Sequence, residues 1–330
     1  MLHGKSLSAA IFTGVLAAGN LGCSGNDGAE KPQGGDHDVL DLAAPSNGVQ
    51  IRTQGTTIAA MSDEEWCEVV EIPGEPGKEY YVGRTEVQMT EFSHHLIINM
   101  AAEGTKALED AQVGPAVPCV GGAQQLFGSD LVSLGGSVQP YNESIYPSGI
   151  GQVVRGGQKL VFNYHYLNTT EKAVQAKHRF NLHFVDSIEK PARQFGFYLQ
   201  YLQIPPRATA SFVDECTFNS DVYVWGLLRH THRKGKDFNV WWVGGPNDGQ
   251  HLWTTSDWEL DVNYGFDTPL LMPAGTGFRW ECQYENPTDD TVIFGSRATD
   301  EMCILFGSFY AAGDNAATRA QNCYRFTRPN

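Results

Sequence analysis

From about residue 50 onward, apolar residues come in short runs separated by turn-forming residues. The runs are rich in Val, Ile, Tyr, Phe and Trp, with Gly, Pro and Asn-Asp between them, and they cover residues 95–100, 159–167, 179–185, 221–228, 238–243 and 291–294. Residues of these types favour strands. No amphipathic helical pattern lasts more than about two turns, and no fixed-period repeat indicates a propeller or solenoid. The pattern predicts an all-β protein built from antiparallel β-sandwiches.

A candidate domain boundary lies at residues 188–191, where a polar stretch containing Pro191 precedes a new β-like run. A chain of 330 residues is long for a single core. Two sandwiches of roughly 140 residues each fit the part of the chain after residue 48. We therefore expect two tandem domains, at 49–191 and 192–330.

The first residues have the pattern of an export signal. Lys5 precedes an apolar run over residues 7–18, and Gly19-Asn20-Leu21-Gly22-Cys23 follows. This resembles a bacterial lipoprotein signal, which implies a signal peptide at 1–22, a lipid on Cys23 and a flexible, Gly-rich tether at 23–48. The mature protein would then be anchored to the bacterial outer membrane or cell surface. A periplasmic or secreted protein cleaved nearby, or an uncleaved anchor, are the alternatives.

Composition narrows the partners. The net charge of -15 comes from 23 Lys and Arg against 38 Asp and Glu, which excludes nucleic acid, because binding to phosphate backbones depends on cations. We expect membrane contact through the lipid anchor only. The seven cysteines leave one without a disulfide partner, and Cys23 accounts for it. The other six can form disulfides in an oxidising compartment, and six cysteines allow fifteen pairings.

Histidine placement indicates a metal site. Five of the ten histidines lie in three β-like contexts: the adjacent His94 and His95, His165, and then His230 and His232. Residues two apart on a strand point the same way, so His230 and His232 could share a metal ion. Neighbours on a strand point apart, so His94 and His95 would need a bulge or a strand end to do so. Imidazole suits copper, zinc, iron or nickel, and a thioether favours copper.

Taken together with Asp300-Glu301-Met302-Cys303, these motifs resemble the copper type II, ascorbate-dependent monooxygenases over about residues 50–330. The resemblance implies two jelly-roll domains and two copper ions. His94, His95 and His165 would hold the electron-transfer copper. His230, His232 and Met302 would hold the copper that binds O2, and these three would be the catalytic residues. The remaining histidines fit no ligand motif and are expected to be structural or to lie near the N-terminus: His3, His37, His178, His183 and His251.

The implied reaction is hydroxylation of a C–H bond of a small molecule with O2, with ascorbate or an equivalent reductant supplying electrons. The family's second-domain disulfides correspond to Cys282 with Cys303 and Cys216 with Cys323. Cys67 and Cys119 are then left for the first domain. In the chain-entropy model, a disulfide between Cys216 and Cys323 would contribute about 4 to 5 kcal/mol to the stability of the fold.

Substrate contacts depart from the peptide-amidating branch of the family. Its Arg, Asn and Tyr, which hold a substrate carboxylate, correspond here to Leu228, Ile304 and Phe306. A buried carboxylate would lack charge-assisted partners at these positions. Arg229 is one place off and faces the other side of a strand. We therefore expect an uncharged substrate.

Other functions remain open. A non-catalytic copper-binding lipoprotein for storage, sensing or delivery would use the same ligands. A structural or adhesive β-sandwich would make the histidines incidental. Zinc hydrolysis fits less well, because Met is a poor zinc ligand and the sequence has no H-E-x-x-H motif.

Overall fold

The computed structural model describes residues 40–256, 263–295, 297, 299–313 and 321–326. Nearly all of the regular structure is β-strand in several antiparallel sheets, with one short helix, α1 (Ala123–Phe127). The predicted all-β class is confirmed, and each predicted run contains a strand. Within the described residues, no helix is long and apolar enough to cross a membrane.

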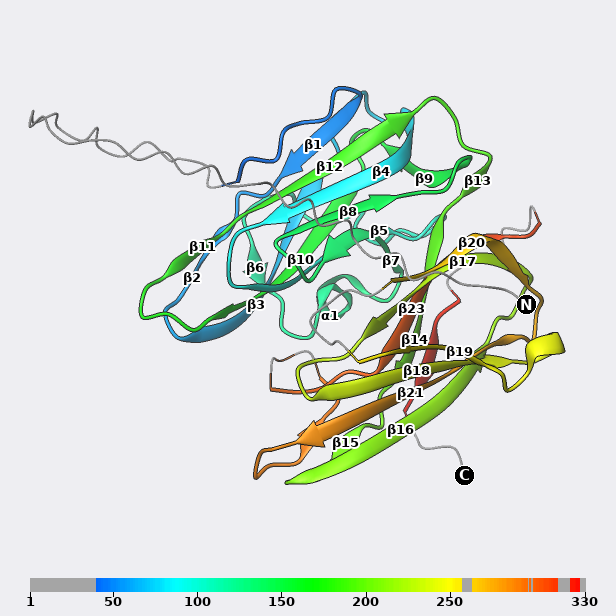
Figure 1. Ribbon diagram of the computed structural model, residues 1–330. Helices are drawn as coiled ribbons and strands as arrows, with labels where there is room; N and C mark the ends of the chain where they lie inside the picture. The colour runs from blue at the N-terminus through cyan, green and yellow to red at the C-terminus, as the bar shows by residue number, and fades with distance from the viewer. Residues whose placement is uncertain (1–39, 257–262, 296, 298, 314–320, 327–330) are drawn as a thin grey trace, which may run out of the picture.

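The N-terminal half, residues 40–191, contains two larger sheets (Figure 1). One has the order β1-β12-β4-β9-β13, with β8 also paired to β4, and the other has the order β6-β3-β10-β5-β7; β11 pairs with β2. The strands are β1 (Gly48–Arg52), β2 (Thr56–Ile58), β3 (Ser62–Glu71), β4 (Glu79–Met89), β5 (Ser93–Ala101), β6 (Val117–Pro118), β7 (Leu131–Ser137), β8 (Tyr141–Ile145), β9 (Ile150–Arg155), β10 (Lys159–Asn168), β11 (Val174–Ala176), β12 (His178–Val185) and β13 (Lys190–Pro191).

The C-terminal half, residues 192–326, contains sheets of order β20-β17-β23-β14-β24 and β16-β21-β18-β19, and β15 pairs with β22. Its strands are β14 (Arg193–Leu199), β15 (Gln203–Ile204), β16 (Ala208–Thr217), β17 (Val222–His230), β18 (Gly235–Val243), β19 (His251–Thr255), β20 (Asn263–Met272), β21 (Gly277–Asn286), β22 (Val292–Ile293), β23 (Ile304–Ala311) and β24 (Cys323–Arg325). A 3-10 turn at Gly245–Asn247 closes the hairpin between β18 and β19.

Each half has its own large apolar cluster between its sheets. The first is drawn from residues 51–182 and the second from residues 195–309. A smaller cluster forms where the segment around α1 covers the outer face of β3 and β10. Because side chains alternate along a strand, one face of each sheet packs into these clusters. The side chains on the opposite face are available to form the site.

The predicted tether is wrong at its C-terminal end. Leu40 is buried, and β1 begins at Gly48. Between them, the carbonyl of Leu42 accepts hydrogen bonds from Gln50 and Arg179, and that of Ala43 accepts one from Asn181. The side chains that bind this segment lie far along the sequence, so its polar composition did not reveal the contact. The rest of the predicted tether, the signal peptide, Cys23, His3 and His37 lie outside the described residues.

Candidate metal centre

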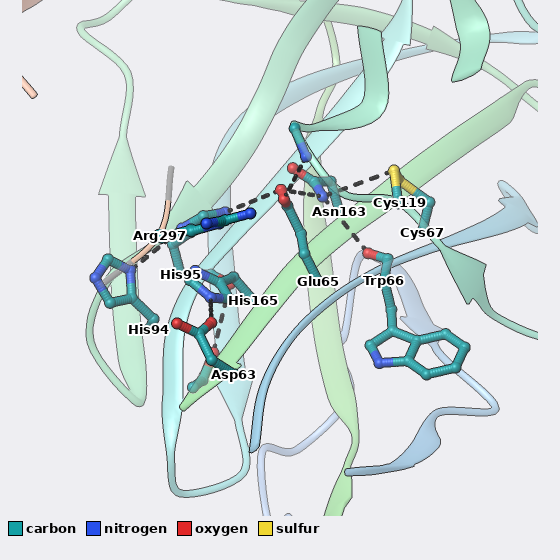
Figure 2. Close-up of polar contacts among 12 residues, drawn as sticks. Asp63, Glu65, Trp66, Cys67, His94, His95, Cys119, Asn163, His165 and Arg297 are labelled. Atoms are coloured by element: carbon teal, nitrogen blue, oxygen red, sulfur yellow. Dashed lines mark hydrogen bonds and ion pairs between the residues drawn. A yellow bond between two sulfur atoms is a disulfide. The ribbon is translucent and has the colours of Figure 1, made fainter. Parts of the chain in front are cut away.

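Three histidines from two neighbouring strands converge on the face of the second sheet that is opposite the large apolar cluster. His94 and His95 lie on β5, and His165 lies on β10. One ring nitrogen of each lies within 4.8 Å of the others. The ring centroid of His165 is 5.0 Å from that of His94 and 5.3 Å from that of His95. Figure 2 shows the three rings together. We call these residues the first histidine set.

A β-bulge makes this set possible. His165 pairs with His95, but the next pair is Tyr166 with Ser93, so His94 is the extra residue on β5. An extra residue re-aims its side chain relative to a regular strand. The sequence-based condition for a shared metal, a bulge or strand end at this pair, is therefore met.

The chemistry of the first histidine set fits a metal ion. Among the described residues, the Nδ1 of His165 and the Nε2 of His95 are buried without a hydrogen-bond partner, and the Nδ1 atoms of His94 and His95 lie 3.3 Å apart. Burial and the nearby imidazoles of His232 and His165 lower the pKa of His94 to about 4. Burial, with the neighbouring imidazoles, also lowers the pKa of His95. Neutral imidazoles are the form that binds copper.

Two carboxylates that the sequence analysis missed support this set. Asp63 on β3 contacts the Nε2 of His165, which leaves Nδ1 facing the other rings. Glu65 lies opposite His165 in the β3–β10 register. Its carboxylate accepts hydrogen bonds from the amide of Asn163 (3.0 Å) and the backbone of Gly121 (2.8 Å), and it lies 3.9 Å from the Nε2 of His95. Figure 2 shows Glu65 between the histidines and the Cys67–Cys119 disulfide. Carboxylates in such positions orient metal-binding histidines.

The second ligand set predicted from sequence lies where β17 ends and β23 begins. His230 is the last residue of β17 and pairs with Ile304, the first residue of β23. If this register continued for two more residues, Met302 would stand opposite His232. The rings of His230 and His232 have centroids 5.3 Å apart. The Nδ1 of His232 donates to the carbonyl of Asp300 (3.0 Å), so its Nε2 is the nitrogen that can bind a metal.

Glu301, the residue before Met302, ties the two strands of this second set together. Its fully buried carboxylate accepts hydrogen bonds from the backbone N–H groups of His232 (2.9 Å) and Lys234 (2.7 Å). Burial raises the pKa of Glu301 to about 7. Burial also lowers the pKa of both His230 and His232. The motif around Met302 was recognised from sequence, but this role of Glu301 was not.

The two predicted sets meet across the two halves of the chain. The rings of His94 and His232 have centroids 5.1 Å apart and an interplanar angle of 82°. The structure thus gathers all five predicted histidine ligands at one place. No sequence pattern indicated this contact, because it depends on how the two halves pack.

Aromatic and aliphatic side chains surround His230. Leu228 lies opposite Phe306 in the β17–β23 register, and the ring of Phe306 is 6.3 Å from His230 and 5.7 Å from Tyr198. Gly196 makes room for Tyr198, since a Cβ there would come within 2.5 Å of its ring. The three positions that replace the carboxylate-binding residues, Leu228, Ile304 and Phe306, therefore lie beside a predicted copper ligand.

Arg229 faces the other side of β17, as expected. It is buried and donates from Nη1 to the hydroxyl of Thr231 (3.0 Å). The other histidines have structural partners: His178 contacts Thr53 and Tyr166, His183 contacts Glu86, and His251 contacts Thr254. The disulfides are Cys216–Cys323 and Cys282–Cys303, the two pairings that the resemblance implied, and Cys67–Cys119, the pair that remained for the first domain.

Comparison with known proteins gives one family match. Residues 196–330 match the C-terminal domain of the copper type II ascorbate-dependent monooxygenases. No curated protein sequence matches the chain. The matched range contains His230, His232 and Met302, but not the first histidine set.

Similar solved structures are distant. PNGF-II is 9% identical with a TM-score of 0.32, over 80% of this chain, and the chain spans 66% of that protein. The STIV MCP is 8% identical with a TM-score of 0.31, over 79% of this chain and 96% of that one. The major capsid protein P2 from bacteriophage PM2 is 7% identical with a TM-score of 0.27, over 81% of this chain and 99% of that one. These similarities carry no inference about function.

Proposed function

We propose that the protein hydroxylates a C–H bond of a small, uncharged substrate, because residues 196–330 match the C-terminal domain of the copper type II ascorbate-dependent monooxygenases. O2 and ascorbate, or an equivalent one-electron reductant, are the co-substrates. The observation that carries the proposal is the meeting of the two ligand sets, with His94 and His232 in ring contact. Two redox metal ions held this way would exchange electrons over a short path.

The donor atoms match two copper ions with different tasks. His94, His95 and His165 offer three imidazoles, and Asp63 and Glu65 hold them in place. His230 and His232 would be joined by the thioether of Met302, a soft ligand that favours Cu(I). Copper, when bound, would supply one-electron redox chemistry and activate O2. Asp300 fixes the tautomer of His232, and Glu301 fixes the backbone that carries it.

The surroundings of His230 favour an uncharged substrate. Leu228, Phe306 and Tyr198 offer apolar surface beside this ligand. Arg229 points into the interior, where its guanidinium contacts Thr231. A substrate carboxylate placed against Leu228 and Phe306 would be desolvated without a charged partner, which costs binding free energy. Amidation of glycine-extended peptides is therefore not part of the proposal.

The proposal includes two tandem jelly-roll domains, at 49–191 and 192–330, and export with a lipid on Cys23. Separate apolar clusters support the two domains. The three disulfides support an oxidising compartment, where such bonds persist.

The test measures O2 uptake and product formation by the copper-loaded protein with ascorbate, across small uncharged substrates. The wild type is expected to form hydroxylated product in step with O2 uptake. Met302→Ile should fold normally and lose turnover, because it removes the only thioether of the set. Met100→Ile, the same substitution on strand β5, is the matched control and should keep turnover.

Two outcomes would contradict the proposal. Full activity in Met302→Ile would remove the role of this residue. Bound copper with O2 reduced only to peroxide, and no hydroxylated product from any substrate, would favour the non-catalytic copper-binding protein instead.

A further inference from the structure

A small basic pocket is lined in part by the residues that immediately follow His232 in the chain. Its cavity, of about 280 Å³, is lined by Arg233, Lys234, Lys236, Glu285, Pro287 and Thr288. Three cations against one carboxylate make it locally positive in a chain whose net charge is -15. Arg233 and Lys234 immediately follow His232 in the sequence, so the pocket begins one residue from a proposed copper ligand.

One wall of the pocket is a tight turn held rigidly in place. The N–H of Gly235 donates to the carbonyl of His232 (3.0 Å), which puts Arg233 and Lys234 at the tip of the turn. The ammonium of the largely buried Lys234 donates to the carbonyl of Thr299 (2.9 Å). Glu301 holds the turn from beneath through the backbone of His232 and Lys234.

The opposite wall, residues 285–288, is equally fixed. The buried Asn286 donates to the carbonyls of Pro205 (2.9 Å) and Asp290 (2.8 Å), and its side-chain oxygen accepts from the backbone of Thr288 (3.1 Å). The backbone of Glu285 donates to the carbonyl of Lys234 (3.0 Å), which joins the two walls. The pocket is therefore preorganised, which lowers the cost of binding a ligand.

We infer that this pocket binds a small organic anion, an enediolate reductant such as ascorbate or a carboxylate, beside His232. The role of this anion in turnover rests on the proposed function, whereas the binding of an anion rests on the positive charge of the pocket. The acidic surface of the whole protein repels anions, so an anionic reductant needs a local positive site to gather near the metal. The cavity suits a molecule of a few carbon atoms and excludes a folded partner. Arg233 and Lys236 are exposed and can contact the ligand. The ammonium of Lys236 also forms an ion pair with the carboxylate of Glu285 at 3.0 Å.

The first experiment measures ascorbate binding to the copper-free full chain by calorimetry without oxygen, at low salt. The test variant is Arg233→Gln with Lys236→Gln. The matched control is Arg155→Gln with Lys106→Gln, which makes the same charge change at exposed residues of the N-terminal half. The test variant should bind ascorbate about tenfold more weakly than the control variant, since two exposed charge contacts are lost. No binding to the wild type, or equal affinity in the two variants, would overturn the inference.

The second experiment identifies the source of the anion by steady-state kinetics of the copper-loaded protein. If the pocket serves the reductant, the test variant should raise the KM for ascorbate about tenfold, with kcat and the KM for the C–H substrate unchanged. If it serves a substrate carboxylate, the KM of a carboxylate substrate should rise instead, which would support the anion site and correct the uncharged substrate. No change in either KM would refute a role in turnover. Because the first experiment needs neither copper nor turnover, the site and the proposed function can fail separately.

Discussion

At the scale of single residues, one carboxylate decides which nitrogen of His165 faces the first histidine set. Asp63 contacts Nε2, and Nδ1 is left buried and without a partner among the described residues. A carboxylate at this position also fixes the orientation of the ring. The side chain is 35% exposed, so its charge acts on the metal site mainly through this one contact.

Replacing this carboxylate should weaken copper binding without unfolding the protein. Asp63→Asn keeps the shape and removes the charge, so we expect about tenfold lower copper affinity at the first histidine set, the lower end of such effects. Competition with a Cu(I) chelator measures it. Glu64→Gln is the control, because Glu64 contacts Ser62, Trp66 and the backbone of Ala59 rather than the histidines. Equal affinity in the two variants would show that Asp63 does not position His165.

His178 gives a prediction about pH that is independent of copper. Burial lowers its pKa to about 3, against an unfolded value of about 6.5. Between these values the unfolded chain binds a proton that the folded protein does not, so stability is lost as the pH falls through this window. His178→Gln should lower the free energy of unfolding at neutral pH. It should also reduce the slope with which this free energy falls at acidic pH, by up to about 1.4 kcal/mol per pH unit. Urea denaturation of the copper-free protein at several pH values tests this, and equal slopes would contradict it.

At the scale of elements, the strands could be predicted because alternation and turn residues are local signals. The need for a bulge at His94 and His95 followed from the same alternation, and the β5–β10 register contains one. The roles of Asp63, Glu65 and Glu301 could not be predicted. Each depends on strand register between residues far apart in sequence, such as Asp63 and His165. A run of acidic residues has the same sequence pattern whether its side chains face solvent or a buried histidine ring.

The disulfide beside Met302 should matter more for copper than for stability. Cys282–Cys303 closes a loop with a sequence separation of 21, and Cys216–Cys323 one of 107. In the chain-entropy model the first disulfide contributes about 3 kcal/mol to the free energy of unfolding, and the second contributes about 4 to 5 kcal/mol. Replacing Cys282 and Cys303 by Ala should therefore destabilise the protein less, yet reduce the copper retained after dialysis from two ions to one. Replacing Cys216 and Cys323 should leave both ions bound. Elemental analysis and denaturation of both variants test this, and the opposite copper loss would refute it.

At the scale of the whole molecule, the site belongs to the contact between two otherwise separate bodies. The large apolar clusters of the two halves have no described residue in common. Each disulfide joins residues within one half. The contact itself includes the ring pair of His94 and His232 and an ion pair between Glu103 and Arg193 at 3.3 Å. Exposed ion pairs contribute little to stability. The ring pair of His94 and His232 brings the two ligand sets together.

This division predicts two unfolding transitions in calorimetry of the copper-free protein. Each half has its own large apolar cluster and its own disulfides, so we expect the two halves to unfold in separate transitions. Bound copper would stabilise whichever half holds it, because a ligand that binds the folded state stabilises that state. His165→Asn should then abolish the copper-induced shift of one transition, and His230→Asn that of the other. A single transition that both variants shift alike would show that the halves unfold as one unit. The contact of His94 with His232 would then be part of a common core rather than a junction between two.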